Sequence, residues 1–380
     1  MEKQKEGARL KEVASLFLKL GTIGFGGPAA HIAMMQHEVV TRRQWISEQH
    51  FLDLIGATNL IPGPNSTEMA IHIGRERVGV KGLVVAGLCF ILPAVLITAL
   101  FAWLYKQYGQ LPQVQPFIYG IQPAIIAIIL AAIVPLAKKS LKGTETALMG
   151  LAALVLALTG VNEILVMFGA GFLALAVKAI RDRQLKSGMN SIFPLALLQM
   201  TETPLVALTN VRLFLIFLKI GAILYGSGYV LFAFLDAELV AKGLLTRHEL
   251  MDAIAVGQFT PGPVFSSVTF IGYQISGWTG AVLATIAIFL PSFVFVALLN
   301  PLVRKMRNST LFSAFLDAVN VASVAIIVAI CYQMGKESIT DWRTILIGIL
   351  SLIVAFSFRK VNSALVVAGG AMLGYLLFLV

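Results

Sequence analysis

Residues 17–28 read FLKLGTIGFGGP, and residues 217–228 read FLKIGAILYGSG. Both stretches end in glycines that interrupt an apolar helix, since glycine costs about 1 kcal/mol and proline about 3 kcal/mol inside a helix. Further matches at a nearly fixed offset are Glu38 with Glu238, Pro62-Gly63-Pro64 with Pro261-Gly262-Pro263, and Gly74, Gly79 and Gly82 with Gly272, Gly277 and Gly280. The chain therefore contains two copies of one unit.

The composition is that of a membrane protein. Of the 380 residues, 58% are hydrophobic and only 13% are charged, whereas soluble domains carry about 25% charged residues. Several apolar runs are long enough for the roughly 20 residues of a membrane-crossing helix, and the alternating pattern of barrel strands is absent. The sequence thus predicts an all-α polytopic membrane protein. The apolar runs cover residues 83–105, 117–137, 144–160, 164–180, 280–303, 313–334, 344–358 and 361–380.

The basic residues of the loops indicate how the two copies are oriented. Loop 75–81 of the first copy is basic, whereas its counterpart 273–280 carries no basic residue. Loop 304–307 of the second copy is basic, whereas its counterpart carries only Lys106. The bias inverts at four consecutive pairs of loops. Because basic loops stay on the cytoplasmic side, the sequence predicts antiparallel copies, as in many secondary transporters, and a cytoplasmic N-terminus.

We expect the first repeat to cover residues 1–188 and the second to cover residues 212–380. Antiparallel copies need an odd number of crossings between equivalent points. An extra crossing is therefore expected in the linker 189–211, unless a re-entrant segment elsewhere supplies the same parity. The expected total is 12 or 13 transmembrane helices in the inner (plasma) membrane.

Four helix breaks, two in each copy, form the predicted substrate site. Residues 13–25 rise only about 20 Å, short of the roughly 30 Å hydrocarbon core, so the break is expected at mid-depth between two half-helices. Glycine at a helix cap followed by proline leaves backbone N–H groups at the positive end of the helix dipole, which attracts an anion. The residues expected to hold a tetrahedral oxyanion are Lys19, Gly26, Gly27, Pro28, Pro62, Gly63, Pro64, Asn65, Ser66, Lys219, Gly226, Ser227, Gly228, Pro261, Gly262, Pro263 and Ser266.

Each of these residues also has a structural interpretation. The glycines and prolines of the breaks can serve only for kinks or close helix packing. Lys19 and Lys219 lie in apolar sequence ahead of the breaks, where a lysine either anchors the anion or extends to the membrane interface. Gly82 and Gly280 lie away from the breaks and are interpreted as loop or packing glycines whose replacement has less effect.

Four acidic or basic residues are candidates for coupling transport to an ion. Glu68 and His72 share one helix face after the first PGP break, and the second copy has nothing ionisable at their places. They form either a proton relay or a structural contact. Glu38 and Glu238 are paired by the repeat and are interpreted as interhelix clamps or solvated groups, with a coupling role as the alternative.

This combination of residues resembles the chromate ion transporter family. The resemblance rests on Phe25-Gly26-Gly27-Pro28 with His31 and Glu38, then Trp45, Phe51, Pro62-Gly63-Pro64, Gly74 and Leu92-Pro93. It covers both copies and so implies the long, two-domain form, with chromate efflux, sulfate as the structural analogue, and chromate resistance. The second copy has Gly226-Ser227-Gly228 in place of Gly-Gly-Pro and Leu231 in place of His31, so the resemblance does not imply equal substrate roles for the two copies.

Other classes of function fit the sequence less well. A transporter of sulfate or another oxyanion uses the same features, whereas a scaffold without transport leaves the breaks unexplained. An enzyme has little support, because Cys89 and Cys331 are the only cysteines and no catalytic, cofactor or metal-ligand motif is present. Nucleic-acid binding has no basic stripe to support it. The expected partners are chromate or sulfate, a coupling ion such as the proton, and lipid, with a homodimer as one option for assembly.

Overall fold

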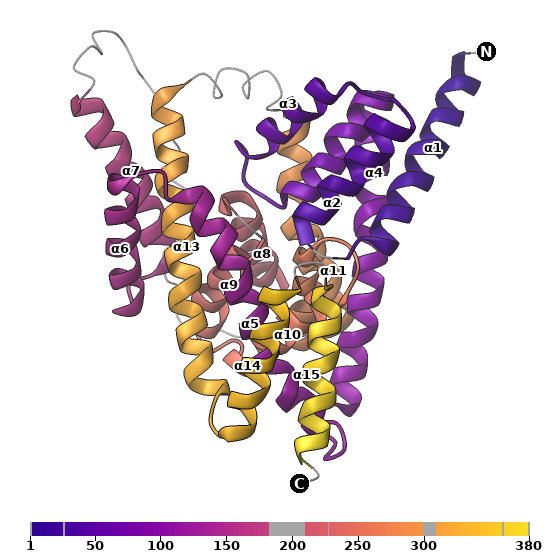
Figure 1. Ribbon diagram of the computed structural model, residues 1–380. Coiled ribbons are helices and arrows are strands. Elements are labelled where there is room, and N and C mark those ends of the chain that lie inside the picture. Colours follow the sequence, from indigo (N-terminus) through magenta and orange to yellow (C-terminus); the bar gives the residue numbers. More distant parts are fainter. Residues whose placement is uncertain are drawn as a thin grey trace.

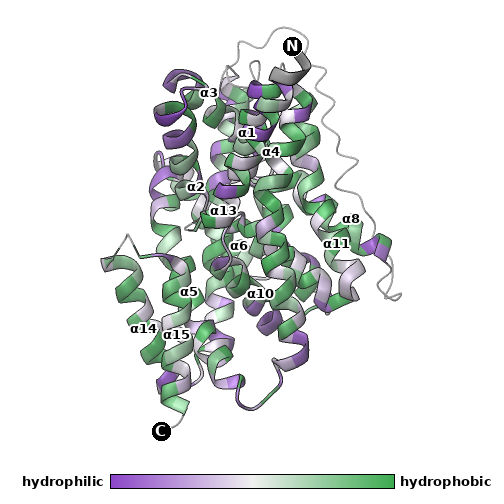
Figure 2. Ribbon diagram, turned by 90° about the vertical axis from the view of Figure 1, so that its right-hand side faces the viewer, coloured by the Kyte–Doolittle hydropathy of each residue, from purple (hydrophilic) through white to green (hydrophobic). Residues whose placement is uncertain are grey.

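The computed structural model describes residues 2–25, 27–181, 210–226, 228–298, 309–358 and 361–378. Within these ranges every regular element is a helix. The helices form an elongated bundle with the start of α1 at one end and the end of α15 at the other (Figure 1). Hydrophobic residues cover most of the helices, and hydrophilic residues gather around α3 and in loops (Figure 2). The expected all-α, polytopic fold is confirmed.

The two copies produce corresponding series of helices. The first forms α1 (Glu2–Ile23), α2 (Gly27–Gln36), the π-helix η1 (His37–Arg42), α3 (Glu48–Thr58), α4 (Asn65–Tyr108), α5 (Gln115–Ser140), α6 (Thr144–Leu158) and α7 (Glu163–Arg181). The second forms α8 (Asn210–Ile223), α9 (Val230–Leu235), the π-helix η3 (Asp236–Val240), α10 (Arg247–Phe259), the 3-10 helix η4 (Val264–Ser266), α11 (Ser267–Leu298), α13 (Thr310–Ser338), α14 (Trp342–Ser357) and α15 (Ser363–Phe378).

Five of the described helical stretches are long and apolar enough to cross a membrane. They are α4, α5, α7, α13 and the continuous stretch Val264–Leu298. The stretches that are interrupted by the breaks fold as hairpins rather than as straight helices.

The chain reverses direction at the helix breaks. Lys19 of α1 and Glu38 of η1 form an ion pair at 2.9 Å, although a straight helix would separate residues 19 positions apart by about 28 Å. Lys219 and Glu238 pair in the same way at 2.7 Å. The two half-helices expected around each first break are therefore present, and they fold back on each other as a hairpin.

The PGP break of the first copy is also the tip of a hairpin. His50, at the start of α3, lies 3.4 Å from Glu76 in α4, so both arms of this hairpin have their outer ends on the same side. In the second copy, a Cβ atom added to Gly257 of α10 would lie 2.9 Å from the Cβ atom of Ser267. The second PGP break therefore also brings its two flanking helices together.

A further sharp turn lies inside α4 and inside α11. Val78 (φ −140°, ψ 20°) and Gly79 (φ 66°, ψ −148°) leave the helical region, and Ser276 (φ −140°, ψ 27°) and Gly277 (φ 59°, ψ −149°) repeat these angles closely. The positive φ explains a glycine at both positions. Beyond the turn the arms of α4 pack against each other, since a Cβ atom added to Gly74 would lie 2.5 Å from the Cβ atom of Ala86.

The hairpins of the first copy open toward the end of the bundle that holds the start of α1, which we call the N-terminal face. Arg77 pairs with Glu12 of α1 at 3.0 Å, and Lys81 pairs with Glu6 at 3.0 Å. Residues 80–108 then run the length of the bundle, a rise of about 42 Å, to the end that holds the last turn of α15, which we call the C-terminal face (Figure 1).

The hairpins of the second copy open toward the C-terminal face. Gln274 donates to the Ala102 carbonyl at 3.0 Å, and Lys106 lies over the Tyr273 ring at 5.6 Å. Both contacts place the turn inside α11 beside the far end of α4, opposite the equivalent turn of the first copy. Equivalent turns thus lie on opposite faces, as the loop charges predicted.

The ends of the linker also lie on opposite faces. Arg181 pairs with Glu145 at 2.7 Å near the N-terminal face, whereas Asn210 accepts a hydrogen bond from Ser276 at 2.6 Å near the C-terminal face. The extra crossing predicted in 189–211 falls almost entirely outside the described residues, as does the basic loop 304–307.

The two copies are interleaved rather than set side by side. Helices α6 and α7 of the first copy pack on α13 of the second, and α14 and α15 of the second pack on α5 of the first. Equivalent contacts also occur within each copy, where α1 packs on α4 in the first and α8 packs on α11 in the second. The main hydrophobic core accordingly draws residues from both copies, such as Ile125, Phe217 and Val319.

Candidate functional site

The hairpin tips of the two copies are hydrogen-bonded to each other. The Gly63 N–H donates to the Leu224 carbonyl at 2.8 Å, and the Gly262 N–H donates to the Gly24 carbonyl at 2.7 Å. Each bond joins the PGP tip of one copy to the first break of the other. A Cβ atom added to Gly228 would lie 4.0 Å from Pro28, so the two first breaks also adjoin. All four breaks lie together inside the bundle.

These two hydrogen bonds change how the tips can meet an anion. Because the N–H groups of Gly63 and Gly262 already donate to carbonyls, they are not available to a substrate in this arrangement. An anion would have to use groups at the starts of the following helices, or the tips would have to separate first.

The prolines of the tips lie at or next to helix starts. Pro28 is the second residue of α2, whereas Pro64 and Pro263 are the N-cap residues of α4 and η4, one position earlier than the sequence analysis placed them. A proline fits each position because its missing N–H has no helical partner there. Helix N-termini from both copies therefore point toward the joined tips.

Two of the three polar side chains proposed near the PGP tips already make hydrogen bonds within the protein. The Asn65 amide donates to the Asn59 side chain at 2.9 Å. Ser66 is buried, and the buried Ser266 hydroxyl accepts from Thr98 at 3.3 Å.

The proposed residues of the first breaks are less buried. Gly27 and Pro28 are half-buried, as is Gly228, whereas Gly226 is exposed. Gly26 and Ser227, which the sequence analysis also included, lie outside the described residues.

Several buried polar atoms close to the tips lack a hydrogen-bond partner among the described residues. They are His31 Nδ1, Thr67 Oγ1, Glu68 Oε2, His72 Nε2 and Ser267 Oγ. Each of these side chains is at most 1% exposed. Buried polar atoms are normally satisfied, so this group is a candidate place for an ion, a proton or water during transport.

Glu68 makes its hydrogen bond to the second copy rather than to His72. Its Oε1 atom accepts from the Ser292 hydroxyl of α11 at 3.3 Å. This contact identifies Ser292 as the residue that meets the Glu68 carboxyl.

Lys19 and Lys219 are engaged in ion pairs rather than free beside the tips. Hydrogen bonding to Lys19 lowers the pKa of Glu38 to about 2, against the effect of burial, and Arg43 and Arg42 act in the same direction. Burial by itself raises the pKa of Glu238, but hydrogen bonds from Lys219 and Lys242 outweigh it and the net shift is downward. These ion pairs fit the interpretation of Glu38 and Glu238 as interhelix clamps.

The fold brings to the tips some polar residues that the sequence did not predict there. Ser292 and Thr98 come from long helices of the opposite copy, and only the position of Ser292 directly after the repeat-paired Pro291 marks it. His31 entered only as part of the family motif, yet its Nε2 atom lies 2.8 Å from the Gly24 carbonyl. Because a carbonyl only accepts, this nitrogen must be the donor.

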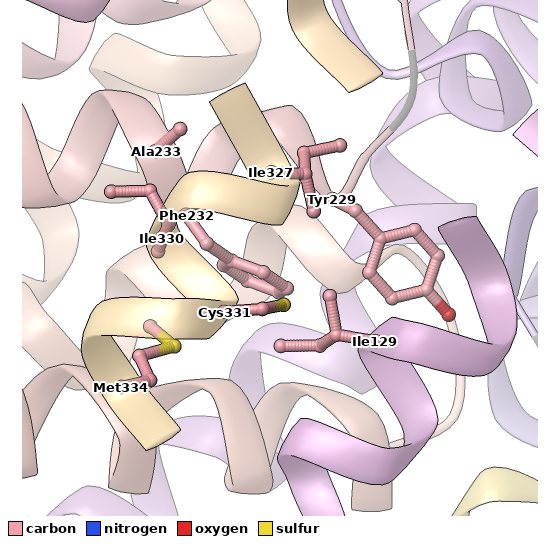
Figure 3. A pocket seen from close by; sticks show the side chains of 8 residues that line it. All are labelled: Ile129, Tyr229, Phe232, Ala233, Ile327, Ile330, Cys331 and Met334. Carbon is pink, nitrogen blue, oxygen red and sulfur yellow. The ribbon is translucent and has the colours of Figure 1, made fainter. Parts of the chain in front are cut away.

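A cavity elsewhere in the bundle has the wrong lining for an anion. It lies between α5, α9 and α13, and in Figure 3 the Tyr229 hydroxyl points away from the other lining side chains. The remaining lining residues are Ile129, Phe232, Ala233, Ile327, Ile330, Cys331 and Met334. Such a surface cannot replace the hydration of a doubly charged ion, so the joined tips remain the candidate site.

The antiparallel copies, the membrane-length helices and the inward-pointing hairpin tips together define a helical membrane transporter with an inverted repeat. The family model described as "Chromate transporter" matches the chain twice, over residues 11–175 and 211–375. The chain belongs to the chromate transporter family, and it is a transport protein rather than an enzyme.

Curated relatives align with nearly the whole chain. A probable chromate transport protein of Synechococcus elongatus is 32% identical over 96% of this chain and 95% of its own. The chromate transport protein of Cupriavidus metallidurans is 31% identical over 96% and 92%, and that of Pseudomonas aeruginosa is 27% identical over 95% and 91%. No solved structure matches the chain significantly.

Proposed function

We propose that this chain is a secondary active transporter that exports chromate across the bacterial plasma membrane and thereby confers chromate resistance. The observation that carries the proposal is the pair of hydrogen bonds that joins each PGP tip to the first break of the other copy. The names of the full-length relatives supply the substrate.

The inverted arrangement suggests how the site is exposed to either side. The Gly63 tip belongs to a hairpin that opens to the N-terminal face, and the Gly262 tip belongs to one that opens to the C-terminal face. Separating one tip from its partner break would open the centre toward one face while the other contact stays closed, which is alternating access. The opening of a tip would also release a backbone N–H for the oxyanion.

Helix dipoles favour an anion at this place. The starts of α2 and α4 carry the positive ends of their dipoles to the centre from the first copy, and η4 and α11 start there in the second. In the closed arrangement the charges of Lys19 and Lys219 are already paired with glutamates, so we assign anion binding to the helix starts rather than to the lysines.

Counterflow in proteoliposomes tests the function. Vesicles that contain the purified protein and unlabelled chromate should accumulate labelled chromate from outside, and sulfate should compete to the extent that it shares the site. Accumulation of sulfate without accumulation of chromate would make the chain a sulfate transporter instead. An imposed proton gradient then tests the coupling ion and the direction.

Gly27→Ala tests whether the substrate approaches a tip. Gly27 has φ 77° and open space where a Cβ atom would lie, and Gly160, in the turn between α6 and α7, has φ 86° and equally open space. Both replacements therefore impose a similar backbone strain. We expect Gly27→Ala to weaken chromate binding at least tenfold and Gly160→Ala to leave it unchanged, measured by ligand-induced thermal shift. Equal binding in the two variants would remove Gly27 from the site.

A further inference from the structure

The two PGP tips occupy equivalent places but meet different chemistry. A Cβ atom added to Gly63 would lie 2.5 Å from the Ser292 hydroxyl, and one added to Gly262 would lie 2.9 Å from the Ala94 Cβ atom. Ser292 and Ala94 directly follow the repeat-paired prolines Pro291 and Pro93. Each PGP tip thus contacts a long helix of the opposite copy at an equivalent place. The Gly63 tip meets the hydroxyl group of Ser292, and the Gly262 tip meets the methyl group of Ala94.

The two tips also differ in the residue five positions after the tip glycine. Glu68 follows Gly63 at the spacing at which Ser267 follows Gly262. The Glu68 carboxyl contacts the tip, because a Cβ atom added to Gly63 would collide with its Oε1 atom, and the same atom accepts from Ser292 at 3.3 Å. The first tip therefore contacts a carboxyl of its own copy that accepts from a hydroxyl of the opposite copy, whereas the second tip has Ser267 in place of the carboxyl and Ala94 in place of Ser292.

One of the two carboxyl oxygen atoms of Glu68 has no hydrogen-bond partner among the described residues. Glu68 is 0% exposed, and the oxygen without a partner is Oε2. An unpaired carboxylate buried in this way is costly, whereas a protonated carboxyl is tolerated. A structural carboxyl would be expected to have its partners, so the position requires another explanation.

The charged and titratable groups near Glu68 on its own copy lie toward the N-terminal face. On its own helix His72 lies one turn away, with Nε2 unpartnered, followed by Arg75, which donates to the Val296 and Ala297 carbonyls of α11. From the second copy, Tyr225 directly follows Leu224, whose carbonyl accepts from the Gly63 N–H at 2.8 Å. Further out, His50 of α3 pairs with Glu76 at the N-terminal face.

We infer that Glu68 binds the coupling proton and that Ser292, which reaches it from the opposite copy, is a positioning residue that ties the protonation of Glu68 to the place of the Gly63 tip. Each molecule then has one such proton site, at one of its two equivalent tips. This inference rests on the proposed function, since it names the coupling site of that transport. The proton forms an O–H bond with the carboxylate from the side of His72, and after the tip has moved this bond breaks and releases the proton toward the opposite face.

The repeat provides a matched pair of variants for the test. Ser292→Ala gives the first tip the methyl group that the second tip already has, and Ala94→Ser does the reverse. In Ser292→Ala the ionised carboxylate loses a donated hydrogen bond, so we expect the midpoint of the pH profile of chromate counterflow to rise by about one pH unit. Stimulation by an imposed proton gradient should fall, while counterflow at the optimal pH stays within about twofold of the unmodified protein. Ala94→Ser should change neither.

Glu68→Gln provides the second measurement and covers the case in which Ser292→Ala does not fold. It should retain chromate counterflow and lose both the pH profile and the response to the gradient. Unchanged profiles in both Glu68→Gln and Ser292→Ala, with normal chromate counterflow, would overturn the proton site but leave the transport function intact. Absence of chromate counterflow in the unmodified protein would instead overturn the proposed function. Uptake driven by a sodium gradient in place of a proton gradient would also overturn the proton assignment.

Discussion

At the scale of single residues, the repeat conserves structural contacts and varies the chemical ones. Both copies have a lysine before the first break that pairs with a glutamate after it, at 2.9 Å in the first and 2.7 Å in the second. Glu68 and His72 have no ionisable counterpart. A contact that folds the hairpin is needed in both copies, whereas a proton site is needed only once. The symmetric residues are therefore expected to affect stability, and the asymmetric ones are expected to affect coupling.

The pH dependence of stability tests the Glu38 clamp. The folded pKa of Glu38 is about 2, below its ordinary value of 4.5. A lowered pKa means that the clamp contributes fully above about pH 4.5 and is lost as the pH falls toward 2. The melting temperature of the unmodified protein should exceed that of Glu38→Gln by a constant amount from pH 8 to about pH 5.5, and the difference should shrink at lower pH. A difference that stays constant down to pH 3 would contradict this assignment.

At the scale of elements, the positions of the breaks were predictable, but their shape was not. Clustered glycine and proline interrupt a helix wherever they occur, so Gly24–Pro28 and Pro62–Pro64 can be located from the sequence. Whether the next segment continues or returns depends on contacts such as that of His50 with Glu76 at 3.4 Å, which join residues far apart in the chain. The spacing shared by Lys19–Glu38 and Lys219–Glu238 was a usable signal, because two opposite charges repeated in apolar surroundings favour a pair.

The tight packing around Gly82 could also not be predicted from the sequence. The sequence predicts that replacing Gly82 or Gly280 has less effect than replacing a break glycine. In the structure, however, a Cβ atom at Gly82 would collide with the Gly74 carbonyl oxygen, and one at Gly280 would collide with that of Gly272. The clash is with backbone on the other arm of a tight hairpin, which cannot move aside cheaply. These glycines are therefore required for the reversal inside α4 and α11.

Replacement of Gly82 should accordingly impair folding. Overpacking in a well-packed core costs about 1–3 kcal/mol and sometimes more, so Gly82→Ala should lower the melting temperature and the yield of monodisperse protein. Gly335→Ala in α13 is the control, since a Cβ atom there meets nothing within 4 Å. Equal yield and stability in the two variants would contradict the hairpin in α4.

At the scale of the whole molecule, the inverted repeat makes the two copies mutually dependent. Helices α6 and α7 find their partner in α13, and α14 and α15 find theirs in α5. The loop charges were enough to predict the inversion, because charge bias reports the side of each loop. They carry no information about which helices pack together, so the interleaving could not be derived from them.

The inversion predicts which loops share a face. In a variant without Cys89 and Cys331, single cysteines at Gly143 and Thr310 should react with an impermeant thiol reagent from the same side of the membrane. The ion pair of Lys142 with Asp317 at 2.7 Å places the starts of α6 and α13 together. Cysteines at Leu111 and Thr340 should react from the opposite side, because the Tyr119 hydroxyl at the start of α5 donates to Asp341 at the start of α14. All four positions are exposed, so differences in labelling report the side rather than burial.

The positive-inside rule assigns the Gly143 side to the cytoplasm, since Lys138, Lys139 and Lys142 precede it. Labelling of Gly143 and Thr310 from opposite sides would contradict the inverted repeat, and with it the alternating exposure proposed for the joined tips.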